Sequence, residues 1–277
     1  MRGQPKVATV GSMKDSTAFR PSIAAELGSA IEHGGLVLHY QPIIDLRTGE
    51  IVGAEALVRL EHPLGLIPPA EFIHPAEEIG LIVPLGRWVM RTACEQASTW
   101  HERFGLDLSM SVNASPRQLL DADFVTHVVA TLDETGFDPS RLVIDITEAM
   151  FRRDATSTRE KLMKLRAIGV HVALDDFGTR SSLCHLHDFP IDTIKVDRSV
   201  IGAIGADRTK IDLVRSIAAF ALGLGLDTVA EGVETSAQRD LVTACGYRYA
   251  QGFLFAEPLS ATAFGQTLAD RATITAR

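Results

Sequence analysis

The sequence predicts an α/β protein that folds as a (β/α)8 barrel of the TIM type with an antiparallel first strand. Strand-like runs alternate with stretches of helical period along most of the 277 residues. The connector between the first two strands, residues 45–50, is too short for the crossover that parallel strands require, so these strands are expected to be antiparallel neighbours. A doubly wound open sheet is the competing architecture, because periodicity alone does not show whether a sheet is closed.

The periodicity of apolar residues and the positions of glycines predict the individual helices and strands. Ile23, Leu27 and Ile31 recur at helical spacing, and Gly34 and Gly35 then end the first helix. Helices are expected over residues 21–32, 71–79, 83–104, 123–135, 154–168, 181–188, 208–224 and 235–244, with a final helix from about residue 261. Strands are expected over residues 36–42, 51–59, 108–113, 142–147, 171–175, 193–196, 227–230 and 249–251.

Composition excludes several classes of protein. The formal net charge of −8 argues against binding to a DNA or RNA duplex, where a basic surface supplies most of the affinity. Cys94, Cys184 and Cys245 are widely spaced, as is typical of reduced thiols in a cytoplasmic protein. No apolar run reaches membrane-spanning length, so no membrane is expected as a partner. Residues 1–20 are polar without a period and are expected to be a flexible N-terminal tail before one domain over residues 21–277.

Acidic and amide side chains stand at the end of one predicted strand after another. In a barrel of this type the C-terminal strand ends share one rim, where catalytic groups gather. The residues expected at this rim are Glu55, Asn113, Asp145, Asp175, Asp176, Lys195 and Glu231. Each acid taken alone also suits a helix cap. This interpretation is weaker for acids that follow one strand after another.

The chemistry of these side chains predicts a metal site. Asp175 and Asp176 are adjacent carboxylates, which repel each other unless they are solvated, protonated or share a cation. Oxygen ligands without cysteine suit Mg²⁺ or Mn²⁺. Two such ions polarise a phosphate and supply a nucleophile in line with the leaving oxygen. The rim therefore indicates metal-dependent chemistry on a phosphate.

Several motifs, in this order and spacing, resemble those of the EAL domain family, the cyclic di-GMP phosphodiesterases. Glu55-Ala56-Leu57, followed by Arg59, is similar to the motif from which the family takes its name. The other matching motifs are YQPI at residues 40–43, PPAEFI at 68–73, VNAS at 112–115, DDFGT at 175–179, IKVD at 194–197, AEGVET at 230–235 and AQGF at 250–253. The resemblance spans roughly residues 20–265 and is specific because of the number of ordered motifs.

The resemblance implies hydrolysis of cyclic di-GMP to linear pGpG with two Mg²⁺ or Mn²⁺ ions. The implied ligands of one ion are Glu55, Asn113, Asp145 and Asp175, and those of the other are Asp175, Asp176 and Glu231. The implied catalytic residues are Glu231, Lys195 and Asp176. The implied substrate-binding residues are Gln41, Leu57, Arg59, Glu234 and Gln251. Glu148 would anchor a loop that couples metal binding to a dimer interface, so a homodimer and a sensory or signalling partner protein are also expected.

Two departures from the family pattern leave the activity open. Asp145 stands where the family has glutamate, and aspartate is shorter by about 1.5 Å of reach. In the loop after Asp176 one residue is lost and Arg180 replaces Gly-Tyr, where it is expected to pair with Glu148, to reach phosphate or to point to solvent. The alternatives are an active phosphodiesterase, a catalytically impaired relative that acts as a cyclic di-GMP receptor, and an unrelated barrel hydrolase.

Overall fold

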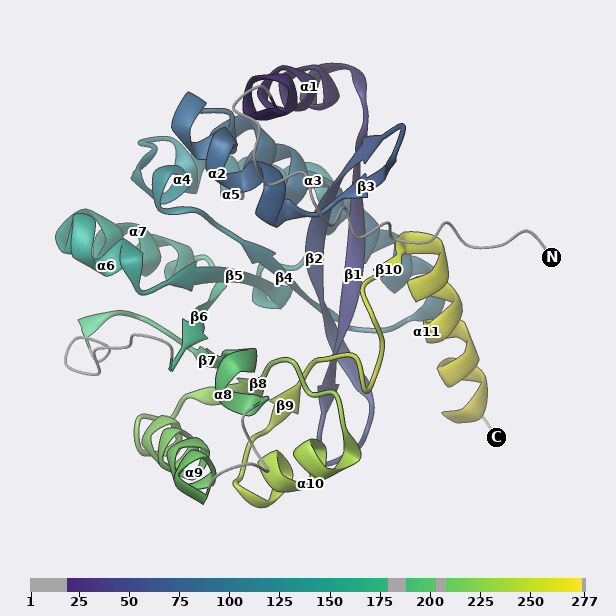
Figure 1. Ribbon diagram of the computed structural model, residues 1–277, viewed down its shortest axis with the longest axis vertical. Coiled ribbons are helices and arrows are strands. Elements are labelled where there is room, and N and C mark those ends of the chain that lie inside the picture. Colours follow the sequence, from purple (N-terminus) through teal and green to yellow (C-terminus); the bar gives the residue numbers. More distant parts are fainter. Residues whose placement is uncertain (1–18, 179–187, 203–207, 276–277) are drawn as a thin grey trace.

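In the computed structural model, which describes residues 19–178, 188–202 and 208–275, eight strands close into a barrel (Figure 1). In spatial order these strands are β1 (Leu36–Asp45), β2 (Ile51–His62), β4 (Ser109–Asn113), β5 (Leu142–Thr147), β6 (His171–Phe177), β7 (Thr193–Val196), β8 (Asp227–Ala230) and β9 (Tyr249–Ala250). The strand β1 pairs with both β2 and β9, which closes the sheet. This closure excludes the open doubly wound alternative and confirms the predicted barrel.

The first strand is antiparallel to both of its neighbours, as the short connector predicted. Its register with β2 places Gln41 opposite Glu55 and His39 opposite Leu57. Every neighbouring pair from β2 round to β9 is parallel, so the C-terminal ends of these strands meet at one mouth. Two short strands extend the sheet outside the barrel, β3 (Gly65–Ile67) on β2 and β10 (Leu259–Ser260) on β1.

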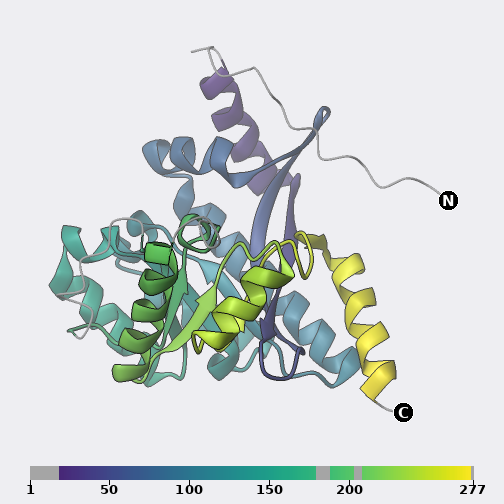
Figure 2. The same cartoon turned by 60° about the horizontal axis from the view of Figure 1, so that its bottom comes forward.

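Helices surround the barrel on its outer side (Figures 1 and 2). The long ones match the predicted periods: α1 (Phe19–His33), α2 (Pro69–Ile79), α3 (Ile82–Phe104), α5 (Phe124–Thr135), α7 (Ala155–Ala167), α9 (Arg208–Gly223), α10 (Ser236–Ala244) and α11 (Ala261–Thr275). Four short segments were not predicted, because they span barely a turn and show no period: α4 (Pro116–Leu120), α6 (Ala149–Arg153), α8 (Arg198–Ile201) and the 3-10 turn Pro139–Arg141. Within the described residues, no helix is both long and apolar enough to cross a membrane.

Some predicted features fall on parts of the chain that the structure does not describe. The helix expected over residues 181–188 lies almost wholly outside the described residues, as do Arg180 and Cys184. Residues 1–18 of the expected N-terminal tail also lie outside them. The helix α1 begins at Phe19, two residues before its expected start at residue 21.

The apolar core lies between the strands of the barrel and the surrounding helices. An aromatic cluster joins β1, α3 and α11: the ring centroids of Tyr40 and Trp100 are 4.8 Å apart, and those of Trp100 and Phe264 are 4.7 Å apart. All three side chains are buried. Edge-on and tilted aromatic contacts of this kind add to the stabilisation from burial, so Trp100 packs the fold, as expected, and is not a stacking platform for a base.

Candidate active site

Polar side chains from successive strands meet at the C-terminal mouth of the barrel. Because side chains alternate across each strand, those at the strand ends that point inward converge on the barrel axis. The cluster consists of Glu55 on β2, Asn113 on β4, Asp145 on β5, Asp175 and Asp176 on β6, Lys195 on β7, and Glu231 and Gln251 just after β8 and β9. The structure therefore brings together every residue that the strand ends were predicted to contribute.

Lys195 lies at the centre of this cluster and is almost fully buried. Its Nζ lies 2.9 Å from Oε2 of Glu55, 2.9 Å from Oδ2 of Asp145 and 3.0 Å from Oε1 of Glu231. Oδ1 of Asp175 is 3.9 Å away. One ammonium group thus faces four carboxyl groups, so it neutralises only part of their charge when they are ionised.

Amide side chains hold Glu55 and Glu231 in place. Nδ2 of Asn113 donates a hydrogen bond to Oε1 of Glu55 at 2.7 Å. Nε2 of Gln251 donates to Oε2 of Glu55 at 2.7 Å and to Oε1 of Glu231 at 3.1 Å. Oε1 of Gln251 is buried without a hydrogen-bond partner. A buried acceptor of this kind is normally satisfied, so this oxygen is an open position for a donor on a ligand or on a hydrated ion.

The electrostatics show an excess of negative charge. Burial raises the pKa of Asp145 to about 7 and that of Glu231 to about 8, because Lys195 offsets only part of the loss of solvation and the neighbouring carboxylates repel. Burial also opposes the ionisation of Glu55, but Lys195 and the amide hydrogen bonds outweigh it and the pKa of Glu55 is lowered. The pKa of Lys195 is raised well above its ordinary value despite its burial, because four carboxylates surround it.

Asp175 and Asp176 stand next to each other at the mouth, as predicted. Burial raises the pKa of both; repulsion from Asp175 and Asp197 adds to the rise at Asp176. The backbone of Asp176 has a φ of +57°, in the left-handed region that non-glycine residues seldom adopt. Its N–H donates to Oδ1 of Asp175 at 2.8 Å. Such a conformation is often retained at a functional site.

A divalent cation fits the chemistry of this cluster, although the side chains do not form a ready-made cage. All the donors are carboxylate or amide oxygens, which are the ligands that Mg²⁺ and Mn²⁺ prefer. Within the described ranges, no group of three or more acidic, histidine or cysteine side chains is arranged around a shared metal position. The reason is that Glu55, Asp145 and Glu231 direct an oxygen at Lys195. A bound cation would compete with this ammonium group for the same oxygens.

The hairpin of β1 and β2 carries the predicted substrate-binding residues. Glu55, Leu57 and Arg59 alternate onto one face of β2, and Gln41 lies opposite Glu55. Nε2 of Gln41 donates to the carbonyl oxygen of Ala256 at 3.3 Å. The Arg59 side chain is partly buried, and Nη1 donates to the carbonyl oxygen of Val58 at 2.9 Å. Burial lowers the pKa of Arg59 from its ordinary high value.

Two other predicted residues lie outside the buried cluster. Glu234 is exposed in the loop between β8 and α10, and its backbone N–H donates to Oε1 of Gln238 at 2.8 Å. Glu148 lies directly between β5 and α6 and is partly buried. The loop that Glu148 was expected to anchor lies outside the described residues, so that role stays a prediction.

Sequence reasoning assigned no role to three residues beside the site. His39 lies opposite Leu57 on β1, and its Nδ1 donates to the carbonyl oxygen of Pro258 at 3.1 Å. Ser111 on β4 donates from Oγ to Oδ1 of Asp145 at 2.5 Å. Asp197 caps α8 through the N–H of Ser199. His39 and Ser111 each stand two residues before a predicted site residue, so the period of two along a strand was the available signal.

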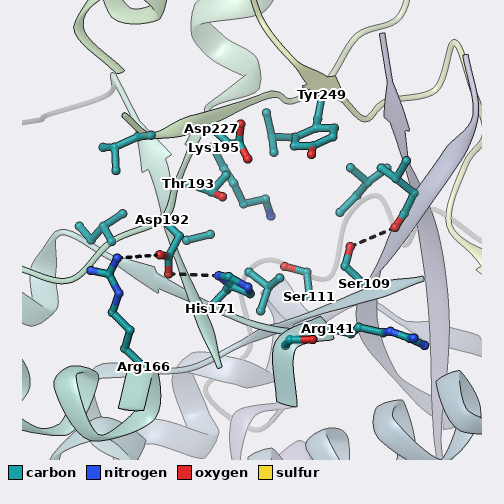
Figure 3. A pocket seen from close by; sticks show the side chains of 18 of the residues that line it. Ser109, Ser111, Arg141, Arg166, His171, Asp192, Thr193, Lys195, Asp227 and Tyr249 are labelled. Atoms are coloured by element: carbon teal, nitrogen blue, oxygen red, sulfur yellow. Dashed lines mark hydrogen bonds and ion pairs between the residues drawn. The ribbon is translucent and has the colours of Figure 1, made fainter. Parts of the chain in front are cut away.

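A cavity of about 770 Å³ opens at the opposite, N-terminal end of the barrel (Figure 3). At its rim Asp192 pairs with Arg166 at 3.7 Å and with His171 at 3.5 Å. The cavity extends inward to Ser111 and Lys195, where it reaches the underside of the carboxylate cluster. Because the carboxylates and Gln251 gather at the other end, the C-terminal mouth is the candidate active site.

The model of the EAL domain family matches residues 24–258 of this chain. The chain belongs to the EAL domain family. Its EAL motif is Glu55-Ala56-Leu57 on β2, which delivers Glu55 to Lys195 and presents Leu57 on the same strand face. The predicted family membership is therefore confirmed.

Other EAL proteins resemble this chain in sequence and in structure. The cyclic di-GMP phosphodiesterase PdeR of Escherichia coli is 42% identical over 240 residues, covering 86% of this chain and 36% of PdeR. A solved structure of PaMucR phosphodiesterase in complex with c-di-GMP is 39% identical with a TM-score of 0.84, covering 88% of this chain and 99% of that one. The EAL enzyme Bd1971, solved with cAMP and cyclic-di-GMP bound, is 28% identical with a TM-score of 0.87. The match covers 92% of this chain and 70% of the Bd1971 chain. The chain spans about a third of the length of the curated relatives it matches.

Proposed function

We propose that this EAL domain hydrolyses cyclic di-GMP to linear pGpG with two divalent cations, Mg²⁺ or Mn²⁺. The observation that carries the proposal is the mouth cluster, in which Glu55, Glu231 and Asp175 surround a buried Lys195 and hold more negative charge than it neutralises. Similar proteins are named cyclic di-GMP phosphodiesterases, and a similar structure contains c-di-GMP.

The residues that would hold the cations are Glu55, Asn113, Asp175, Asp176 and Glu231, which belong to the cluster at the C-terminal mouth. When bound, the ions polarise the phosphate and lower the pKa of a water molecule. Lys195 keeps Glu55 and Glu231 in fixed positions and balances phosphate charge. Glu231, held by Lys195 and Gln251, would orient the attacking water or accept its proton.

The hairpin and the last strand supply the substrate contacts in this proposal. The guanidinium group of Arg59 suits bidentate binding of a phosphate. Leu57 and Gln41 lie on the same face as Glu55 and would border the nucleotide. The unpartnered Oε1 of Gln251 would accept a hydrogen bond from a bound donor, and Glu234 would act from the rim.

The test is a turnover assay with the purified chain. The chain is incubated with cyclic di-GMP and Mn²⁺ or Mg²⁺, and the products are separated by chromatography. The expected result is linear pGpG, with product formation stopped by excess EDTA. Tight binding of cyclic di-GMP without any product would contradict hydrolysis.

A cyclic di-GMP receptor is the second candidate function. The observation that favours it concerns Asp145, which stands where the family has glutamate: its two carboxyl oxygens accept hydrogen bonds from Ser111 and Lys195. A receptor would bind cyclic di-GMP equally well with and without EDTA and would release no pGpG under either condition. The two candidates therefore predict opposite results in the same assay.

We also propose that the chain acts as a homodimer in the cytoplasm and passes its signal to a sensory or signalling protein. Free thiols at Cys94 and Cys245 support a reducing compartment. The dimer is tested by light scattering of the purified chain, with and without cyclic di-GMP. A monomer in both samples would exclude the dimer.

A further inference from the structure

The carboxyl group of Asp145 is fully buried beneath the mouth of the barrel, between Ser111 and Lys195. In the parallel pair of β4 and β5, Asp145 is level with Asn113. The side chain nevertheless bonds to Ser111, which lies two residues nearer the N-terminal end of β4, about 6.6 Å along the strand. In the pair of β2 and β4, Glu55 is level with Ser111, so the Asn113 amide reaches Glu55 across the same two-residue step, which is the stagger of neighbouring strands in a barrel. The complete burial of the Asp145 side chain places its carboxyl group at the floor of the cluster.

Both carboxyl oxygens of Asp145 are already engaged at this floor. Oδ1 accepts a hydrogen bond from Oγ of Ser111 at 2.5 Å, and Oδ2 accepts one from Nζ of Lys195 at 2.9 Å. The Asp145 side chain is 0% exposed, against 8% for Glu55 and 15% for Glu231. Of these three carboxylates, Asp145 is the one that a cation arriving from the mouth would meet last.

We propose that Asp145 is a positioning residue for Lys195, locked in place by Ser111, and that it is not a cation ligand in this chain. This inference rests on the proposed function, because it assigns a role within the same site. The flexibility of lysine supports the inference. A lysine side chain has many rotamers, and a fixed carboxylate beneath its ammonium group confines that group to one position. Ser111 in turn leaves the Asp145 carboxylate one orientation that satisfies both of its oxygens.

The two serines of β4 provide a matched pair of variants. Ser111 and Ser109 lie two residues apart on the same strand, and both line the cavity. Oγ of Ser109 donates to the carbonyl oxygen of Val52 at 3.2 Å, which is outside the carboxylate cluster. Threonine at position 111 keeps the hydroxyl group that donates to Asp145, and the melting measurement shows whether the added methyl group is accepted. Ser109→Ala therefore shows the effect of losing a β4 hydroxyl group outside the cluster. Ser111→Thr shows the effect of changing the residue at position 111 while its hydroxyl group is kept.

The experiment compares the wild-type chain with Asp145→Asn, Ser111→Ala, Ser111→Thr, Ser109→Ala and the double variant Ser111→Ala/Asp145→Asn. The number of Mn²⁺ ions bound per chain is counted by electron paramagnetic resonance of the free ion. Turnover of cyclic di-GMP is measured at saturating Mn²⁺, and circular dichroism melting checks that each variant is folded.

The expected result is a separation of the two readouts. Asp145→Asn and Ser111→Ala should bind as many Mn²⁺ ions as the wild type but turn over at least about tenfold more slowly, because each change loosens the hold on the Lys195 ammonium group. Ser111→Thr should stay within about threefold of the wild type, and Ser109→Ala should equal it. The double variant should be no slower than Asp145→Asn, because Ser111 acts through Asp145.

Three results would overturn the inference. Loss of one bound Mn²⁺ in Asp145→Asn would make Asp145 a ligand. Unchanged turnover in Ser111→Ala, or an equal loss in Ser109→Ala, would remove the positioning role of Ser111. If Asp145→Asn fails to fold, the comparison of Ser111→Ala with Ser111→Thr and Ser109→Ala decides the question. A wild-type chain that neither binds Mn²⁺ nor forms pGpG would instead remove the proposed function, a result distinct from the others because the wild type itself fails.

Discussion

Nζ of Lys195 lies 2.9 Å from Oε2 of Glu55, although 140 residues separate the two along the chain. Both side chains are almost fully buried. A buried ammonium group is costly unless it is paired, and here it is paired with the carboxylates of Glu55, Asp145 and Glu231. The arrangement makes the charge balance at the barrel mouth sensitive to single substitutions, which leads to the following predictions.

Replacement of Glu55 by glutamine should abolish turnover with little change in the fold. Glutamine keeps the shape of the side chain but removes the charge that Lys195 contacts and that a cation would need. We expect turnover to fall by at least about 100-fold, from roughly 3 kcal/mol of lost transition-state stabilisation. The measurement is pGpG formation, with melting followed by circular dichroism. Glu61→Gln is the control, because Glu61 is exposed on the same strand; equal activities of the two variants would refute the role of Glu55.

Replacement of Lys195 by methionine should destabilise the chain and stop turnover. Removing the ammonium group leaves Glu55, Asp145 and Glu231 without their cation, which for a buried pair costs about 3–5 kcal/mol of the free energy of unfolding. Mn²⁺ should recover part of this loss by supplying positive charge. Chemical denaturation at pH 8 with EDTA and with Mn²⁺ measures both effects. Lys164→Met, at an exposed position on α7, should change neither; a comparable loss in that variant would contradict the argument.

The metal-free chain should lose stability as the pH rises from about 4 to about 8. Asp145 and Glu231 have pKa values of about 7 and about 8 in the folded chain, against about 4 when unfolded. The folded state therefore binds more protons in this window, and the free energy of unfolding falls as the pH increases.

Melting temperatures in EDTA at several pH values from 5 to 9 test this linkage. Glu231→Gln should show a flatter pH dependence than the wild type between about pH 5 and 8, because the glutamine does not ionise. Glu61→Gln, at an exposed site, should follow the wild type. Superimposable pH profiles for Glu231→Gln and the wild type would show that Glu231 does not hold a proton in the folded chain.

Replacement of Arg59 by alanine should weaken the binding of cyclic di-GMP without changing Mn²⁺ binding. Arg59 lies on the same face of β2 as Glu55, and its planar guanidinium group can donate two hydrogen bonds to one phosphate. Loss of a charge-assisted contact of about 1.5–3 kcal/mol corresponds to a roughly 10- to 100-fold higher Kd. Calorimetry in EDTA, which prevents turnover, gives the Kd. Arg47→Ala is the matched control, because Arg47 is exposed in the turn at the other end of the same hairpin. An unchanged Kd in Arg59→Ala would remove Arg59 from the binding surface.

Local patterns in the sequence predicted most of the elements, because their causes are local. The helix α3 shows a long apolar period and ends near Gly105, whose φ of 65° suits glycine. The antiparallel first strand followed from a connector too short for a crossover. Short segments such as α4 and α8 were missed because one helical turn has no measurable period.

The sequence by itself determined the order of strands and helices, the resemblance to the family and the set of oxygen-bearing residues at the strand ends, because each depends on periodicity or on ordered motifs within the chain. Only the tertiary structure decided that the sheet closes into a barrel and which way each of these side chains points. It placed Lys195 at the centre of the cluster and turned Asp145 toward Ser111. Side-chain direction depends on contacts between strands that are distant in sequence, on burial and on the balance of charge in the closed barrel, and no local pattern encodes these.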